Sequence, residues 1–292
     1  MTIDTAPAPR VPSDPHTVRA LSLDDVDACL ACARTIGWTA PPEAWALMLE
    51  IGRGFGATAK GALAGAAIAF PFGDVFAMVA MMMVRADVQR QGVGRAILAH
   101  ARDALPPGMA MALYASPEGE RLYRPFGFVD DGVSVRWEGL IERRAPMAHA
   151  SRELREIRDG DADAITALDS VAQGAPRRRL MESLLARRAA GWVIDRGGLV
   201  EGFGLGLREQ EALRIGPIVC ARDDDALAIA DALTPTSGVV RLDLEPGEEA
   251  LLDWAKRWSL ERGELSPRLV FGLDHLPGVR RTSRALAGRA FG

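Results

Sequence analysis

The six residues Gln89-Arg90-Gln91-Gly92-Val93-Gly94 determine how this sequence is interpreted. They follow an apolar strand that we predict to end within Val84–Val88, and they open a helix predicted from Gly94 to Leu105. The first turn of a helix leaves several backbone N–H groups without intrahelical partners, at the positive end of the helix dipole. A strand, a tight turn and a helix start in this order therefore predict an anion site.

Two glycines and two arginines suggest which anion binds there. Gly92 and Gly94 keep side chains away, so that phosphate oxygens can approach the backbone, and Arg90 and Arg95 add positive charge. No Lys-Ser/Thr pair follows the glycines, as a nucleoside-triphosphate loop requires, and the Gly-x-Gly-x-x-Gly pattern of dinucleotide folds is missing here. The turn therefore predicts a diphosphate of another kind.

The composition is that of an ordinary soluble globular protein, with 292 residues, 48% hydrophobic and 25% charged. This length suits two domains, and a formal net charge of −4 argues against a nucleic-acid partner. The longest apolar stretches, such as Phe76–Val84, are less than half of the roughly 20 residues that span a bilayer. Residues 1–16 lack the pattern of a signal peptide and are predicted to be a flexible tail. We expect a cytoplasmic protein without a membrane partner.

The cysteines do not indicate a disulfide framework or a metal site. Cys29 and Cys32 form a lone Cys-x-x-Cys in a helix-like segment, and Cys220 is far away in the sequence. A zinc site would need a second pair of ligands. We expect buried helix residues at these two positions and no metal.

One structural plan occurs twice along the chain. Val18-Arg19-Ala20-Leu21 precedes an acidic helix start, and Leu154-Arg155-Glu156-Ile157 does the same. A hairpin-like turn at 60–65 has its counterpart at 196–202. We therefore predict a tandem duplication of a mixed α/β unit, each copy being a twisted mixed sheet flanked by helices. The predicted domains are 17–145 and 152–292, with a polar connector near Glu142–Ser151.

A second segment of the first copy makes the pattern more specific. Residues 113–128 read Leu-Tyr-Ala-Ser-Pro-Glu-Gly-Glu-Arg-Leu-Tyr-Arg-Pro-Phe-Gly-Phe, a strand followed by a helix that ends in apolar-Tyr-x-x-x-Gly-Phe. Together with Gln89–Gly94, in this order and spacing, the segment resembles the GCN5-related N-acetyltransferase (GNAT) superfamily. The full chain resembles a bacterial subfamily of tandem GNAT proteins.

The resemblance implies a function and a set of binding residues. GNAT enzymes transfer an acetyl group from acetyl-CoA to a primary amine, here of a small molecule or a peptide, by direct attack in a ternary complex. Ser116 stands where many relatives carry an asparagine that contacts the cofactor; the alternative is a turn residue before Pro117. The residues implied for the pantetheine arm are Met82, Met83 and Val84, and those for the pyrophosphate are Gln89, Arg90, Gln91, Gly92, Val93, Gly94 and Arg95.

Tyr123 falls at the family position of the general acid, which protonates the departing thiolate. The alternative is a tyrosine that only packs in the core. No general base is assigned, because Glu43, Asp74, Asp130 and a water relay all remain open.

The second copy lacks the features that mark the first. At the position of the anion turn it reads Ala221-Arg222-Asp223-Asp224-Asp225-Ala226, without glycine and with three carboxylates at the helix start. Those carboxylates would repel a diphosphate. Aligning Pro117 with Pro246 places Leu252 opposite Tyr123. We therefore expect a structural or substrate-shaping second domain.

The acceptor is expected to bind between the two halves, near loops within Trp38–Phe55. The arginines at 177–179 and 187–188 are interpreted as a solvated helix face, with recognition of an acidic substrate as the alternative. The rival function is a non-catalytic acyl-CoA-binding sensor or scaffold. The sequence predicts neither the acceptor nor the oligomeric state.

Overall fold

The computed structural model describes residues 16–59, 61–142 and 153–292. The predicted tail, apart from its last residue, and the predicted connector from residue 143 onward lie outside them, as does Lys60 of the first hairpin turn. The domain limits stay a prediction. In the described ranges, none of the helices is long and apolar enough to cross a membrane.

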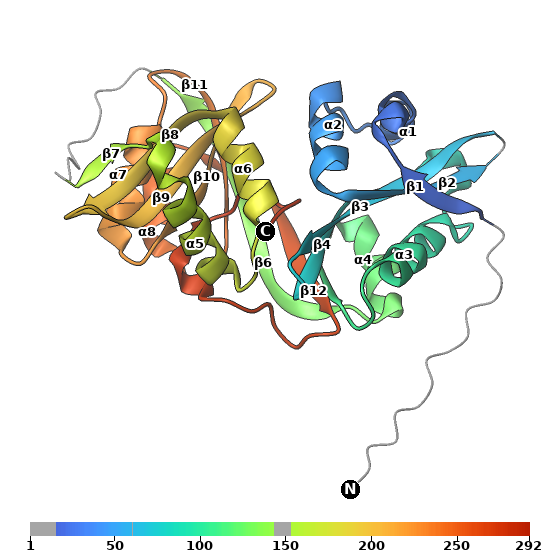
Figure 1. Cartoon of the computed structure of the whole chain (residues 1–292). Coiled ribbons are helices and arrows are strands. Elements are labelled where there is room, and N and C mark those ends of the chain that lie inside the picture. Colours follow the sequence, from blue (N-terminus) through green and yellow to red (C-terminus); the bar gives the residue numbers. More distant parts are fainter. Residues whose placement is uncertain (1–15, 60, 143–152) are drawn as a thin grey trace, which may run out of the picture.

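In the described residues, the first copy combines six strands with four α-helices along the chain (Figure 1). Short 3₁₀ turns, η1 (Leu23–Asp25) and η2 (Ala86–Val88), precede helices α1 and α3. In chain order its strands and α-helices are β1 (Val18–Leu21), α1 (Val26–Arg34), α2 (Pro42–Ile51), β2 (Arg53–Ala59), β3 (Ala62–Phe72), β4 (Phe76–Val84), α3 (Val93–Ala104), β5 (Ala110–Tyr114), α4 (Pro117–Phe126) and β6 (Val129–Ile141).

The second copy repeats this order of strands and α-helices, and two short elements follow the last repeated strand. The added elements are the turn η4 (Arg280–Thr282) and the strand β13 (Ser283–Ala285). The predicted duplication of a mixed α/β unit is confirmed. The repeated elements are β7 (Leu154–Glu156), η3 (Asp159–Asp161), α5 (Ala162–Gln173), α6 (Arg178–Arg187), β8 (Arg188–Arg196), β9 (Leu199–Glu209), β10 (Ala212–Cys220), α7 (Asp223–Leu233), β11 (Gly238–Leu244), α8 (Glu249–Arg257) and β12 (Glu261–Phe271).

The two copies exchange their last strands. The described strands form one continuous sheet in the order β1-β2-β3-β4-β5-β12-β6-β11-β10-β9-β8-β7, with β13 attached to β10. Strand β12 of the second copy pairs with β5 of the first, while β6 of the first copy pairs with β11 of the second. In Figure 1 the long strands β6 and β12 cross from one lobe to the other. The polar groups at this junction are therefore shared by both copies.

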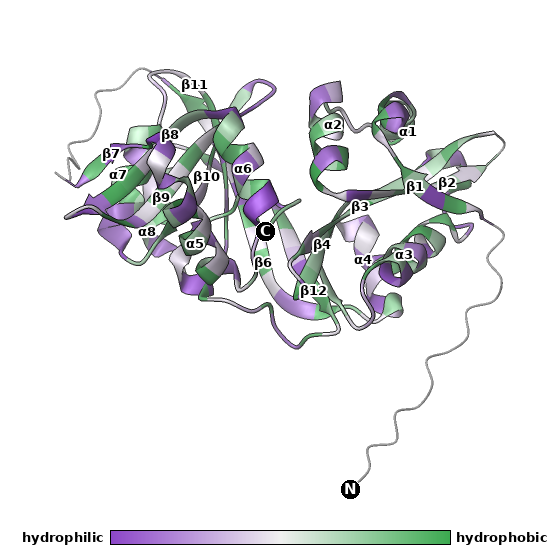
Figure 2. Cartoon of the chain, viewed as in Figure 1, coloured by the Kyte–Doolittle hydropathy of each residue, from purple (hydrophilic) through white to green (hydrophobic). Residues whose placement is uncertain are grey.

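Helices cover both faces of the sheet. Helices α1, α2, α5 and α6 bury their apolar residues in one shared core, which extends across both copies. On the opposite face, α3 and α4 cover the first copy and α7 and α8 the second, each pair with a core of its own. Figure 2 shows this amphipathic pattern, with green and purple alternating along the helices. Cys29 and Cys32 are buried in α1, as predicted.

The arginine-rich segment around α6 joins parts of the chain to one another. Arg177 is fully buried and pairs with Asp169 at 2.6 Å, so its predicted place on a solvated helix face was wrong. Arg179 donates to the backbone oxygen of Glu50 in α2 at 2.6 Å, and Arg187 lies 3.5 Å from the Glu50 carboxylate. These contacts hold α6 against α2, so the described arginines serve the packing of the two copies.

Candidate functional site

Strands β4 and β5 run parallel and separate after a short common stretch. They pair only where Phe76–Met78 faces Ala110–Ala112. Strand β4 continues to Val84 along β3, whereas the end of β5 pairs with β12 on its other side. Among the described strands, none pairs with the β5-facing edge of β4 beyond Met78. Because buried backbone groups need partners, this edge is suited to an extended ligand.

A bulge deforms β4 within the separated stretch. The pairing with β3 shifts between Ala66–Met83 and Ile68–Ala80, so that Met81 and Met82 together face one residue. Met81 has φ +54°, a left-handed conformation that costs about 1 kcal/mol or more for a non-glycine residue. A bulge turns backbone groups away from the ladder. The bulge therefore frees backbone groups beside the opening between β4 and β5.

The turn after β4 ends at the N-terminus of α3. The strand ends at Val84, within the predicted range 84–88, and residues 86–88 form a 3₁₀ turn. Helix α3 begins at Val93, one residue before its predicted start. Its first turn, Val93-Gly94-Arg95, carries no carboxylate, and its N-cap, Gly92, has no side chain. The first-turn amides of α3 are thus free of an intrinsic cap.

The two glycines of this turn have different roles. Gly92 has φ +88°, which favours glycine, and an added Cβ would meet open space. A Cβ on Gly94 would lie 3.2 Å from the Leu122 side chain, so this glycine lets α3 pack closely on α4. The expectation that both glycines clear space for phosphate was therefore incomplete, because Gly94 is also required for helix packing.

One cavity of about 1210 Å³ extends from this turn to the opening between the strands. It is large enough for a drug-sized ligand. Of the residues predicted to bind the cofactor or catalyse, Gln91 alone does not line it, and its side chain donates to the Asp87 backbone at 3.3 Å. The predicted residues that line the cavity are Met82, Met83, Val84, Gln89, Arg90, Gly92, Val93, Gly94, Arg95, Ser116 and Tyr123.

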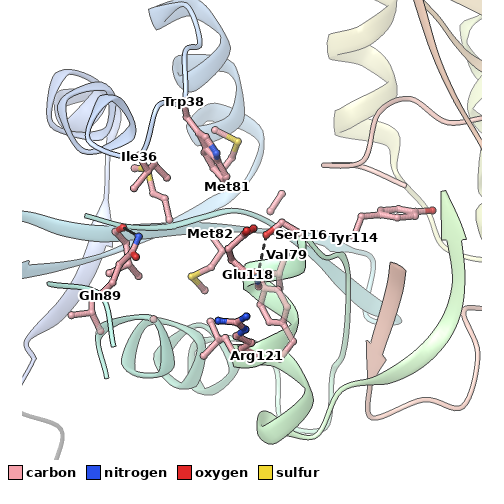
Figure 3. A pocket seen from close by; sticks show the side chains of 18 of the residues that line it. Ile36, Trp38, Val79, Met81, Met82, Gln89, Tyr114, Ser116, Glu118 and Arg121 are labelled. Carbon is pink, nitrogen blue, oxygen red and sulfur yellow. Dashed lines mark hydrogen bonds between the residues drawn. The ribbon is translucent and has the colours of Figure 1, made fainter. Parts of the chain in front are cut away.

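The cavity passes through the sheet. Met82 and Tyr123 belong to the core beneath α3 and α4, whereas Met81 and Tyr114 belong to the core beneath α1 and α2. Figure 3 shows Trp38 and Met81 on one side of the strands, and Met82 on the other. A ligand bound at α3 therefore has an opening toward Trp38, within the segment predicted to contact the acceptor.

Tyr123 is placed by the short helix α4. Its ring is 6% exposed, lines the cavity and packs on Phe128 with 5.7 Å between ring centroids. Burial raises the pKa of the phenol well above its ordinary value. The hydroxyl therefore keeps its proton at neutral pH, as a proton donor must.

Ser116 caps α4 and also lines the cavity. Its hydroxyl oxygen accepts a hydrogen bond from the Gly119 amide at 3.1 Å (Figure 3). Ser116 is thus the N-cap of α4, and its contact with the cofactor stays a prediction that its place in the cavity allows.

None of the carboxylates considered as the general base lines the cavity. Glu43 and Asp74 are exposed elsewhere, and Asp130 pairs with Arg124 at 2.9 Å. The cavity carboxylates are Glu118, in the first turn of α4, and Glu264, in the exchanged strand β12. Sequence reasoning missed Glu264 because no local pattern signals that β12 joins the other copy. In the described part of the chain, no cluster of His, Cys, Asp or Glu could hold a metal ion.

The second copy also contributes to the cavity wall. Ser266 of β12, and Arg289 and Ala290 of the segment after β13, line it together with Arg136 of β6. The expected pocket between the two halves is therefore present in the described residues.

Two family models match the chain. Both are described as an acetyltransferase (GNAT) domain, one matching residues 50–130 and the other residues 165–282. The chain is a tandem GNAT protein. Membership of this family indicates acetyl transfer as the general activity.

Relatives and solved structures agree with this tandem GNAT architecture. An uncharacterised N-acetyltransferase of Bacillus subtilis, YitH, is 26% identical over 228 residues, covering 77% of this chain and 80% of that protein. A Pyrococcus horikoshii protein provisionally assigned as an acetyltransferase superimposes with a TM-score of 0.78 at 22% identity, over 99% of this chain and all of the other. A tandem GNAT protein from the clavulanic acid biosynthesis pathway gives 0.64 at 16% identity, over 88% and 98% of the two chains.

The corresponding cleft of the second GNAT copy is filled by the chain itself. Strand β13 pairs with β10 at Ile218 and Val219, and Leu286 donates its amide to the Asp243 oxygen of β11 at 3.1 Å. An added Cβ on Gly216 would lie 2.2 Å from the Leu286 oxygen. The segment after η4 thus lies between β10 and β11, where the first copy has its open cleft.

The helix start of α7 is neutralised internally. Arg284 of β13 pairs with Asp223, and with Glu248 at 2.5 Å, while Arg196 pairs with the buried Asp225 at 2.7 Å. Two of the three carboxylates predicted from sequence, Asp223 and Asp225, therefore have cationic partners within the chain, and an added diphosphate would be repelled by these carboxylates.

The counterpart of Tyr123 is Ala255 and not Leu252, as aligning Pro117 with Pro246 had indicated. The amide of Phe128 bonds to the Tyr123 oxygen at the end of α4, and the amide of Leu260 bonds to the Ala255 oxygen at the end of α8. Pro246 lies in the loop before α8, whereas Pro117 is the first residue of α4, and this difference shifted the alignment. The second copy still lacks a phenol at this position.

Proposed function

We propose that this tandem GNAT protein is an N-acetyltransferase that transfers the acetyl group of acetyl-CoA to a primary amine, with a single active site in the first copy. The observation that carries the proposal is the cavity that joins the uncapped start of α3 to the opening between β4 and β5. A linear ligand with a diphosphate at one end and an extended amide arm at the other matches both features.

The cofactor would bind mainly through the backbone. The amides around Gly92 and Val93, with Arg90 and Arg95 nearby, would hold the pyrophosphate. The unpaired edge of β4 at Met82–Val84 would pair with the pantetheine arm, in the manner of an added strand. The domains 17–145 and 152–292 would then divide the work, the first binding the cofactor and the second closing the acceptor side.

The reaction needs no covalent enzyme intermediate. The neutral amine attacks the thioester carbonyl carbon, and the resulting oxyanion accepts a hydrogen bond from a backbone amide at the Met81–Met82 bulge. The carbon–sulfur bond then breaks, the amine nitrogen loses a proton to solvent, and the thiolate takes a proton from Tyr123, which regains one from solvent. The products are the N-acetyl amine and CoA thiol.

Thiol release from acetyl-CoA tests this function against a panel of primary amines. Amine-dependent release by the wild type, with one CoA bound per chain by titration calorimetry, supports it. A chain that binds CoA but releases no thiol with any amine would instead favour the non-catalytic acyl-CoA sensor. A chain that binds no CoA contradicts both functions.

A further inference from the structure

The exchanged strands carry a polar stripe on the acceptor side of the sheet. Cross-strand neighbours share a face, and the register pairs Tyr114 with Arg268, and Arg136 with Asp243. Tyr114 belongs to the core beneath α1 and α2, so the stripe starts on that side of the sheet. In Figure 3 the Tyr114 side chain points away from the cleft toward the second copy. The stripe therefore leads from the cleft into the junction between the copies.

Asp243 is the carboxylate around which the arginines of this stripe gather. Its carboxylate is completely buried and is contacted by three arginines, Arg214 at 2.5 Å and Arg136 and Arg289 at 3.2 Å each. Arg214 also pairs with Glu209 at 2.5 Å, so its charge is balanced away from the cavity. Arg136 and Arg289 both contact the same oxygen of Asp243, its Oδ1 atom.

The two sharing arginines are the ones that line the cavity. The hydrogen bonds of Arg136 to Asp243 are long, at 3.2 and 3.4 Å, and leave its second terminal nitrogen available. The Nε atom of Arg289 is buried and makes no hydrogen bond within the described residues. Burial lowers the pKa of Arg289, and the nearby charge of Arg136 lowers it further, against the opposing effect of Asp243. Arg136 therefore has a terminal nitrogen for an anion, whereas both terminal nitrogens of Arg289 donate to Glu264, so an anion at Arg289 would compete with the exposed Glu264 side chain.

The segment that carries Arg289 is fixed by contacts with Arg177 and Phe70. It lies in the segment 286–292, whose backbone oxygens at Phe291 and Gly292 accept hydrogen bonds from the buried Arg177 at 2.7 and 3.0 Å. The Phe291 ring packs against Phe70 with 5.1 Å between centroids. This preorganisation reduces the entropy cost of binding a ligand at Arg289.

The charged groups that face the cavity indicate the kind of ligand. Glu264 pairs with Arg289 at 3.1 Å, and its side chain is 53% exposed, so water weakens this pair. The formal charges of Arg136, Arg289, Asp243 and Glu264 sum to zero, but Asp243 is buried and does not line the cavity, so two guanidinium groups and one solvated carboxylate face it. An arginine fork fits a carboxylate in two-point geometry.

We infer that the acceptor is an amine that also carries a carboxylate, which Arg136 and Arg289 bind while the amine enters the opening between β4 and β5. This inference depends on the proposed acetyl transfer and narrows its acceptor class. The competing explanation is that both arginines serve only to neutralise Asp243.

The test uses pairs of amines that differ only in the carboxylate. We would compare linear ω-amino acids, from glycine to 6-aminohexanoate, with their amides and with 2-aminoethyl phosphate, by thiol release from acetyl-CoA. At least one amino acid should exceed its amide about tenfold or more in kcat/KM. Arg136→Gln should abolish this preference by raising KM for the amino acid alone. Arg241→Gln is the matched control, because Arg241 belongs to the same network through Glu209 and does not line the cavity.

Calorimetry on the CoA-loaded chain separates the two possible failures. If amino acids bind to the wild type but not to Arg136→Gln, the anion site is supported. If no acetyl transfer accompanies this binding, only the acetyl transfer is refuted. Acetylation without preference for the carboxylate, or an equal loss for amino acid and amide in Arg136→Gln, overturns the anion site. Preference for the phosphate over every amino acid overturns the carboxylate.

Discussion

Replacing Gly92 by aspartate should copy the acidic helix start of the second copy onto the first. Gly92 is the N-cap of α3, and an added Cβ meets no atom within 4 Å, so the substitution disturbs no packing. Its φ of +88° is strained for most side chains, but aspartate and asparagine tolerate the left-handed region best. The change therefore acts mainly through charge.

The size of the effect follows from Coulomb's law. A carboxylate about 6 Å from one phosphate charge costs about 3 kcal/mol at an effective dielectric constant of about 20. Because position 92 is exposed, screening reduces this to about 1.5 kcal/mol, or roughly a tenfold weaker Kd for CoA. The difference in Kd for CoA between the wild type and the aspartate variant should shrink at about 1 M salt, where the Debye length is only about 3 Å.

Gly92→Asn is the matched control, with the same shape and conformational preference but no charge. Titration calorimetry with CoA should give the asparagine variant an affinity near that of the wild type. The aspartate variant should remain as stable as the asparagine variant, since aspartate is a good N-cap. Equal CoA affinities of the two variants would refute the assignment of this turn as the pyrophosphate site.

Three further outcomes follow from single side chains. Tyr123→Phe should lower kcat about a hundredfold while leaving the Kd for CoA unchanged; unchanged turnover would remove Tyr123 from catalysis. Arg177→Met should lower the free energy of unfolding in urea by about 3–5 kcal/mol, because it leaves the buried Asp169 unpaired; adding Asp169→Asn should restore part of the loss, and no restoration would contradict the pairing. Burial raises the pKa of Glu248 to about 7 from 4.5, so the folded state binds the extra proton and stability should fall as pH rises from about 4.5 to about 7. Glu248→Gln should flatten this part of the stability profile, measured by thermal unfolding across that range, and an unchanged slope would show that another group causes it.

The sequence predicted those features that depend on short-range patterns. The turn at Gln89–Gly94, the helix after it and the apolar core residues of α1 follow from local spacing and were found in place, within one or two residues at the boundaries. The duplication was also visible, because both copies repeat the same local signals in the same order. The roles proposed for Tyr123 and Ser116 stay predictions.

The features that sequence missed depend on long-range pairing. Strands β6 and β12 are compatible with either copy, and only the complete sheet determines their exchange. That exchange brings Glu264 and Ser266 to the cavity of the first copy. The same limit applies to Arg177, whose buried partner Asp169 and backbone contacts at 291–292 lie on different elements, so that local sequence suggested an exposed position. Long-range contacts of this kind leave no periodic signal.

The central claim is one acetyl-CoA site, in the first copy, beside a second cleft filled by the chain itself. A crystal structure of the chain with CoA tests it most directly. The account predicts one CoA per chain, with its pyrophosphate at the amides of residues 90–95, its pantetheine arm along Met82–Val84, and β13 still paired with β10. A CoA molecule between β10 and β11, with β13 displaced, would contradict it.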